Sequence, residues 1–217
     1  MRQNIQAIIF DMDGTMVDNM AVHTRTWISF FAERGIALDP RSFHDRTAGR
    51  TTPEILRMFL GDDLSVEQVY ALGEEKEARY RDFFRKHARP VTGLIELLHA
   101  ARAAGYKLGV ATAAPPENVA LTLGCLGLSN FFDVIVNGAE VRNGKPDPEL
   151  FLMAAARLAV DPRACLVFED APMGVEAARR AGMQAVVVTT TLSAEEGRQL
   201  SGVIHTVSDF SESLELI

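Results

Sequence analysis

The sequence has 217 residues, of which 47% are apolar and 24% charged. These values exclude a disordered or fibrous chain and suit one large domain, or a core domain with a smaller insertion. The net charge is -7, so the broad basic surface of a typical nucleic-acid-binding protein is absent.

Short apolar runs that are typical of buried parallel strands recur along the chain, with helical patterns between them. They cover residues 5–10, 108–111, 132–136, 165–168 and 185–188. Alternation of strand and helix predicts a doubly wound parallel sheet, which is a Rossmann-like α/β core.

Helix ends can be read between these strands. Residues 93–104 place leucines on one face, and Gly105 follows as a left-handed stop. Asp147 is expected to cap a helix over residues 148–159. The "SAEE" sequence at residues 193–196 has the pattern of a capping box.

One connection is much longer than a crossover between parallel strands requires. Roughly ninety residues separate Asp13 from the run at 108–111, where a few dozen would suffice. The excess has helical patterns, and residues 66–87 are expected to carry their large apolar side chains on one side. An earlier run has helical spacing at Met16, Met20, Trp27, Phe30 and Phe31.

We therefore expect two domains. Residues 1–17 and 89–217 would form the catalytic α/β core, and residues 18–88 would form an inserted helical cap. Trp27 and its aromatic neighbours are expected to form the core of the cap rather than a surface that binds substrate.

Polar motifs follow four of the apolar runs. They are "FDMDGT", "ATAA", "GKPDP" and "FEDAPMG". The carboxyl ends of parallel strands share one edge of a sheet, where ligands bind at the switch in strand order. Motifs that lie far apart in the sequence should therefore meet in space.

Acidic residues dominate this predicted edge. Asp11 and Asp13 are two residues apart, so in extended chain their side chains face the same way. Glu169 and Asp170 add two more carboxylates, and such a cluster repels itself unless a cation binds. Oxygen ligands beside a phosphate favour Mg²⁺. The predicted ligands are Asp11, Asp13, Asp170 and Glu169, although Glu169 could instead support the site from behind.

Other residues of the motifs suit a bound phosphate. Gly14 lets the backbone turn close to the phosphate oxygens. Thr112 offers a hydroxyl group, and Lys145 offers a positive charge. Each residue alone has an ordinary interpretation as a turn, cap or surface residue. Their occurrence together at four strand ends indicates an active site.

The four motifs resemble those of the haloacid-dehalogenase-like hydrolase superfamily over nearly the whole chain, in its beta-phosphoglucomutase-like and sugar-phosphatase branch. The resemblance implies that Asp11 is the nucleophile and that Asp13 is the general acid and base. The second aspartate of "DMDGT" favours phosphoryl transfer over dehalogenation. Thr15 and Ala113, which belong to the same motifs, are expected to bind substrate.

Within the predicted cap, the resemblance points to His23, Arg50 and Lys76 as substrate-binding residues. "DNMAVHTRTW" is similar to a segment that carries a histidine and a tryptophan in beta-phosphoglucomutases. The alternative is that Arg50 and Lys76 are solvated helix charges and that His23 is a satisfied residue at the helix surface.

These observations favour a Mg²⁺-dependent phosphatase of a small phosphorylated metabolite, such as a sugar phosphate. A beta-phosphoglucomutase-type mutase is the nearest alternative, and a non-catalytic phosphate-binding module is another. We expect a monomer or weak homodimer with no nucleic-acid or membrane partner. The physiological substrate stays open.

The expected location is the cytoplasm. No apolar stretch near the N-terminus has the length of a signal peptide or a membrane span. Cys125 and Cys165 lack metal-type spacing, and we expect both to be reduced and buried as small apolar side chains. An isolated nucleophilic cysteine is the alternative.

Overall fold

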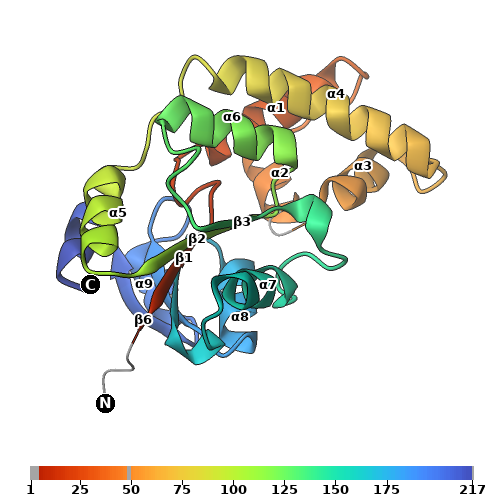
Figure 1. The fold of residues 1–217 in the computed structure, drawn as a ribbon. Helices are drawn as coiled ribbons and strands as arrows, with labels where there is room; N and C mark the ends of the chain where they lie inside the picture. Colours follow the sequence, from red (N-terminus) through yellow and green to blue (C-terminus); the bar gives the residue numbers. More distant parts are fainter. Residues whose placement is uncertain (1–4, 48–49, 217) are drawn as a thin grey trace. The chain divides into compact units, whose positions relative to one another are not determined.

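The computed structural model describes residues 5–47 and 50–216 (Figure 1). The chain divides into two compact units. The larger, called the core unit below, comprises Met1–Asp18 and Ala88–Ile217, and the smaller, called the helical unit, comprises Asn19–His87. That the helical unit acts as a cap stays a prediction.

The core unit contains a six-stranded sheet in which all neighbouring strands are parallel. Its strand order, β3-β2-β1-β4-β5-β6, reverses direction from β1, as the doubly wound prediction requires. The strands are β1 (Ala7–Phe10), β2 (Lys107–Ala111), β3 (Val134–Val136), β4 (Cys165–Glu169), β5 (Gln184–Val188) and β6 (Val203–Val207).

Helices cover both faces of this sheet (Figure 1). Ile8 and Phe10 of β1 pack in a cluster with α5, while Ala7 and Ile9 pack in a second cluster with α7 and α8. This alternation follows from the two-residue period of a strand. The helices of the core unit are α5 (Leu94–Ala103), α6 (Pro116–Leu126), α7 (Glu149–Leu158), α8 (Pro172–Arg180) and α9 (Ala194–Gln199). The described residues also form the 3₁₀ helices η1 (Gly138–Glu140), η2 (Pro162–Ala164) and η3 (Phe210–Leu216).

Several predicted helix ends are confirmed. Gly105 follows α5 with a φ of 85°, and Ser193 forms a capping box with Glu196 at the start of α9. Asp147 accepts a hydrogen bond from the Glu149 amide at 3.0 Å, but α7 starts one residue later than predicted.

The helical unit consists of α1 (Met20–Ala32), α2 (Pro40–Thr47), α3 (Thr52–Leu60) and α4 (Val66–Phe84). Trp27, Phe30 and Phe31 form its core together with side chains from α2, α3 and α4, as predicted. Met16, in contrast, packs in the core unit.

The predicted apolar face of α4 is wrong in part. Val66 and Tyr70 are 74% and 75% exposed, whereas Val69 and Tyr80 are buried. The buried stripe continues through Lys76, so a charged residue occupies a position that an apolar pattern would not include.

The prediction for the cysteines is also half wrong. Cys165 is buried, but Cys125 is exposed. Cys125 lies on the solvent side of α6, where the preceding Gly124 is exposed as well. Neither cysteine forms a disulfide. None of the helices within the described residues has the length and apolar character needed to cross a membrane.

Candidate active site

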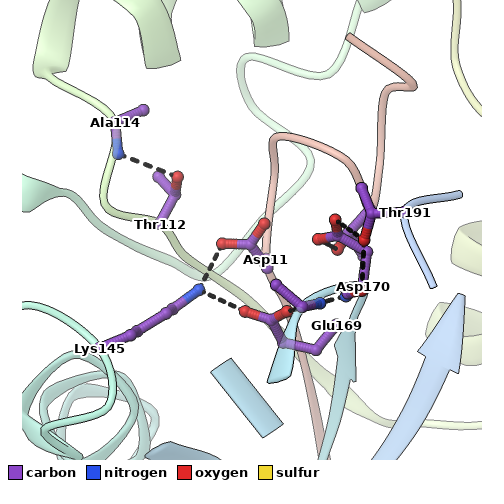
Figure 2. A network of polar contacts seen from close by, with 9 residues as sticks. Asp11, Thr112, Ala114, Lys145, Glu169, Asp170 and Thr191 are labelled. Carbon is purple, nitrogen blue, oxygen red and sulfur yellow. Dashed lines mark hydrogen bonds and ion pairs between the residues drawn. The ribbon is translucent and has the colours of Figure 1, made fainter. Parts of the chain in front are cut away.

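The site centres on Asp11, which directly follows β1 and is 6% exposed. Its amide donates a hydrogen bond to the Phe168 carbonyl at 3.0 Å, which fixes the residue against β4. Lys145 Nζ lies 2.5 Å from Asp11 Oδ1 and 2.7 Å from Glu169 Oε1 (Figure 2). Three of the motifs predicted to converge therefore meet at the carboxyl edge of the sheet.

Burial and neighbouring charges shift the pKa values of Asp11 and Lys145. Burial raises the pKa of Asp11 well above its ordinary value, and the carboxylates of Glu169 and Asp170 act in the same direction. Burial opposes the charged form of Lys145, yet the Asp11 and Glu169 carboxylates raise the pKa of this ammonium group above its usual range. Lys145 is therefore charged at neutral pH, and the acids around it still outnumber it.

Glu169 is held from several sides. Its Oε1 accepts from Lys145, and its Oε2 accepts from the backbone amides of Asp170 and Ala171, both at 2.8 Å. Gly174 of α8 packs directly against this carboxylate, since a Cβ at Gly174 would lie 1.6 Å from Oε1. Glu169 was considered either as a direct metal ligand or as a supporting residue. The geometry favours the supporting role, in which Glu169 holds Lys145 in place.

Asp170 is held differently, by neutral hydroxyl groups. Its Oδ1 accepts from the Thr15 hydroxyl and its Oδ2 from the Thr191 hydroxyl, both at 2.9 Å. Burial and the Glu169 charge raise the pKa of Asp170 to about 7. The two hydroxyl groups carry no charge, so they do not offset the negative charge of the ionised Asp170 carboxylate as Lys145 does for Glu169.

The donor chemistry suits a divalent metal ion. Among the described residues, no three acidic, histidine or cysteine side chains converge closely enough to enclose an ion. Mg²⁺, however, is commonly held by one or two carboxylates together with water and substrate phosphate, not by a cage of protein ligands. Asp11 and Asp170 both lie at this edge (Figure 2), close enough for the Asp170 charge to help raise the pKa of Asp11 after burial and the Glu169 charge. These two carboxylates fit such a site.

The loop after Asp11 is shaped by its glycine. Gly14 has a φ of 85°, and its amide donates to the Val17 carbonyl at 2.8 Å. A Cβ at this position would lie 2.2 Å from Asp170 Oδ2, so only glycine lets the loop approach Asp170 so closely. Asp13 is partly exposed in the same loop, where its backbone pairs with that of Val17.

Thr112 lies at the end of β2 and is 1% exposed. Its hydroxyl oxygen accepts a hydrogen bond from the Ala114 amide at 3.1 Å (Figure 2). No described residue accepts the hydroxyl hydrogen of Thr112, so the group can still donate a hydrogen bond to a ligand. Ala113 is exposed, and its carbonyl packs against Gly138.

The helical unit contains its own buried polar group, formed by two of the three residues predicted there. Lys76 Nζ lies 2.9 Å from His23 Nδ1 and 2.7 Å from Glu77 Oε1. The His23 ring stacks on Tyr80 with 3.9 Å between the ring centroids. The predicted alternative of a solvated Lys76 is therefore wrong, because the residue is 1% exposed.

Arg50 differs from this pair. Its side chain is exposed, and its Nε donates to the Arg46 carbonyl at 2.9 Å. Within the part of the chain that the structure describes, no hydrogen bond or ion pair joins Arg50 to His23 or Lys76.

Three residues of the core unit were missed in the sequence. Thr190 donates to the Gly14 carbonyl, Thr191 donates to Asp170, and Gly174 makes room for Glu169. A signal was present, because the "TTT" run follows the β5 strand just as the four recognised motifs follow theirs. Hydroxyl groups carry no charge, so the run reads as an ordinary loop.

The sequence matches the family model of the haloacid dehalogenase-like hydrolases over residues 8–188. The chain belongs to this family. Its strand-end motifs are those that the sequence resemblance had identified, and the six-stranded parallel sheet is the corresponding fold. The chain is therefore an enzyme, and the phosphatases among its relatives support a phosphatase.

The curated relatives include phosphatases and a mutase. Validoxylamine A 7'-phosphate phosphatase of Streptomyces hygroscopicus subsp. limoneus is 35% identical over 86% of this chain and 87% of its own length. Fructose-1-phosphate phosphatase YqaB of Escherichia coli is 31% identical over 87% of this chain and 98% of its own. Beta-phosphoglucomutase of Mycobacterium bovis is 34% identical over 98% and 92%, respectively.

A solved structure has the same fold over nearly the full chain. The family IA, variant 3 hydrolase of Entamoeba histolytica superposes with a TM-score of 0.90 at 27% identity, covering 96% of this chain and 95% of its own.

Proposed function

We propose that this enzyme is a Mg²⁺-dependent phosphatase of a phosphorylated sugar and that Asp11 is its nucleophile. The contact of Lys145 with both Asp11 and Glu169 carries the proposal. It joins a buried carboxylate to a fixed positive charge at the edge of the sheet where a phosphate would bind. The phosphatase relatives support the reaction, and fructose-1-phosphate phosphatase supports the substrate class.

The residues divide the work as follows. A carboxylate oxygen of Asp11 attacks phosphorus, the bond from phosphorus to the sugar oxygen breaks, and Asp13 protonates that oxygen. Asp13 then takes a proton from water, which attacks the aspartyl phosphate and releases inorganic phosphate. Lys145 and Thr112 would stabilise the charge that develops on the phosphate oxygens. Gly14, whose amide already bonds to the Val17 carbonyl, would contribute through the tight turn of the nucleophile loop and not as a donor.

Asp11 and Asp170 are the side chains proposed to hold Mg²⁺, with Asp13 as a further ligand from the nucleophile loop. Mg²⁺ would offset the repulsion between the carboxylates and the phosphate dianion. Glu169 would keep Lys145 in place. Burial, together with the Glu169 and Asp170 carboxylates, raises the pKa of Asp11, so bound positive charge favours the ionised carboxylate that attack requires.

The helical unit is proposed to contribute substrate contacts through His23 and Lys76, with Arg50 as a third candidate. Thr15 and Ala113 are proposed to contact the phosphate-bearing end of the substrate. A phosphosugar mutase remains the second candidate, because beta-phosphoglucomutase of Mycobacterium bovis is 34% identical over almost the whole chain. In a mutase the phosphoryl group returns to the sugar instead of passing to water.

The test is an assay of wild type and Asp11→Asn on a panel of sugar phosphates, with and without Mg²⁺. We expect wild type to release inorganic phosphate only with Mg²⁺, and Asp11→Asn to lose more than about a thousandfold in rate, since no other group can form the covalent intermediate. Asp161→Asn is a matched control, because Asp161 pairs with Arg163 on the exposed surface.

The outcomes separate the candidates. Conversion of glucose 1-phosphate to glucose 6-phosphate, dependent on a bisphosphate primer and without phosphate release, would identify a mutase. A folded wild-type protein that binds phosphate but turns over no substrate would identify a non-catalytic module. Full activity of purified Asp11→Asn would exclude the covalent mechanism.

A further inference from the structure

The loop after β5 makes a contact with the acidic motif that the proposed mechanism leaves unused. Thr191 lies 21 residues beyond Asp170, yet its hydroxyl oxygen is 2.5 Å from the Asp170 carbonyl and 2.9 Å from Asp170 Oδ2 (Figure 2). We propose that Thr191 is a positioning residue that holds the Asp170 carboxylate in the orientation needed to bind a divalent cation. This inference rests on the proposed function only in placing the cation at Asp170.

Both oxygens of the Asp170 carboxylate are held, and from different loops. Thr15 donates to Oδ1 from the nucleophile loop, and Thr191 donates to Oδ2 from the loop after β5. Gly14 closes the space behind the carboxylate. Two donors on opposite oxygens fix the rotation of the group, which one donor would leave free. Such outer contacts determine how a ligand presents itself to a metal ion.

The type of donor matters as much as its place. Glu169, next in sequence, receives an ammonium group, and Lys145 offsets its charge. Asp170 receives hydroxyl groups, which orient the carboxylate without cancelling its charge. The two adjacent acids therefore have different partners, and a cation that binds Asp170 would not have to displace Lys145.

Thr191 has a second acceptor, so it can hold Asp170 both with and without a bound cation. A hydroxyl group has one hydrogen, so Thr191 shares it between the Asp170 carbonyl and Oδ2. When Oδ2 is engaged elsewhere, the hydrogen can pass wholly to the carbonyl, and Thr191 stays bonded to Asp170. Valine has nearly the same shape and cannot make either bond.

The experiment compares wild type with Thr191→Val, Thr191→Ser and Thr189→Val. Thr189 is a matched control, because it lies in the same loop and its hydroxyl bonds to no described residue. Mg²⁺ binding to the substrate-free protein is measured by isothermal titration calorimetry, and the melting temperature of each variant is recorded. Phosphate release is then measured across Mg²⁺ concentrations. Thr191→Ala replaces the valine variant if valine disturbs folding.

We expect Thr191→Val to weaken Mg²⁺ binding by about ten- to a hundredfold, the usual effect of removing a group behind a metal ligand. The Mg²⁺ affinity of Thr191→Ser should lie within a few-fold of wild type, and that of Thr189→Val should match wild type. High Mg²⁺ concentrations should restore much of the phosphate-release rate that Thr191→Val loses.

Wild-type Mg²⁺ affinity in Thr191→Val would overturn the proposal, as would equal losses in Thr189→Val. A wild-type protein that binds no Mg²⁺ would overturn it too. Mg²⁺ binding that depends on Thr191 in a protein without phosphatase activity would support this inference while excluding the proposed function.

Discussion

Each unit of the molecule contains a lysine that is largely shielded from solvent, with 11% of the Lys145 side chain and 2% of the Lys76 side chain exposed. The two lysines have different partners. Lys145 of the core unit contacts two carboxylates, Asp11 and Glu169, which lie 134 and 24 residues away in the sequence. Lys76 of the helical unit contacts the adjacent Glu77 and the ring of His23. One ammonium group thus joins three strand-end motifs of a sheet, and the other joins two helices.

The difference lies in the remaining charge. Lys145 with its two acids carries a net negative charge, to which the nearby Asp170 adds, so the core unit favours an added cation. Lys76 and Glu77 balance one another, and His23 accepts through Nδ1, which requires that nitrogen to be unprotonated. The buried polar group of the helical unit thus contains a cation of its own, whereas carboxylates outnumber the cation in the core unit.

The largest expected effect comes from removing Lys145. Lys145→Met leaves Asp11 and Glu169 buried without their partner, which typically costs about 3–5 kcal/mol of unfolding free energy. Denaturant unfolding at neutral pH measures this loss. Phosphatase activity should disappear as well.

The destabilisation of Lys145→Met should shrink as the pH falls, because protonation neutralises the two acids. Added Mg²⁺ should restore part of the stability by replacing the lost positive charge. A Lys145→Met protein as stable as wild type at neutral pH would show that the acids find another partner.

Replacing Lys76 should have an intermediate and selective effect. Lys76→Met should lower kcat/KM for sugar phosphates by about ten- to a hundredfold, the value of a hydrogen bond from a charged group. Hydrolysis of an aryl phosphate, which offers no sugar hydroxyls, should change much less. Comparing kcat/KM for both substrates measures the selectivity.

A double variant, Lys76→Met with Glu77→Gln, controls for the acid that the single change leaves unpaired. If kcat/KM falls equally for the sugar phosphate and the aryl phosphate in both variants, Lys76 supports the structure of the helical unit in general, and other residues determine the specificity.

The smallest effect is expected on the surface. Arg79 pairs with Glu33 at 2.6 Å and with Glu75 at 2.7 Å, and its side chain is 33% exposed. Arg79→Ala should change the unfolding free energy by less than about 1 kcal/mol, because solvent screens such pairs and ordering the side chains costs entropy. Thermal unfolding at low and high salt checks this. A loss of more than about 2 kcal/mol would mean that the network is coupled to buried structure.

The sequence predicted those parts of the molecule that charge and apolar runs determine. Asp11 and Asp170 were selected as candidates because they stand just beyond apolar runs, and Lys145 was selected because its motif is the next polar motif after the run at 132–136. The β6 strand was missed because His205 and Thr206 interrupt its apolar pattern, and most of this edge strand is exposed or half-buried.

Other features depend on three-dimensional contacts that no spacing encodes. Glu169 and Asp170 are adjacent in sequence, and only the fold shows that one receives an ammonium group and the other hydroxyl groups. The charge of Lys76 suggested solvent exposure, whereas packing against Trp27 and Tyr80 and the contact with Glu77 allow it to be buried. Thr191 is recognisable only once β5 is placed beside β4.

Two glycines inside helices show why stabilising substitutions cannot be chosen from sequence alone. Gly to Ala within a helix commonly gains up to about 1 kcal/mol, so an engineer would select both Gly124 of α6 and Gly174 of α8. At Gly124 the added methyl group would meet only the Ser129 hydroxyl, at 3.9 Å. At Gly174 it would displace Glu169, which holds Lys145, which holds Asp11. A substitution that raises the helix propensity of α8 would thus disturb the position of Asp11 through two intervening side chains, Glu169 and Lys145.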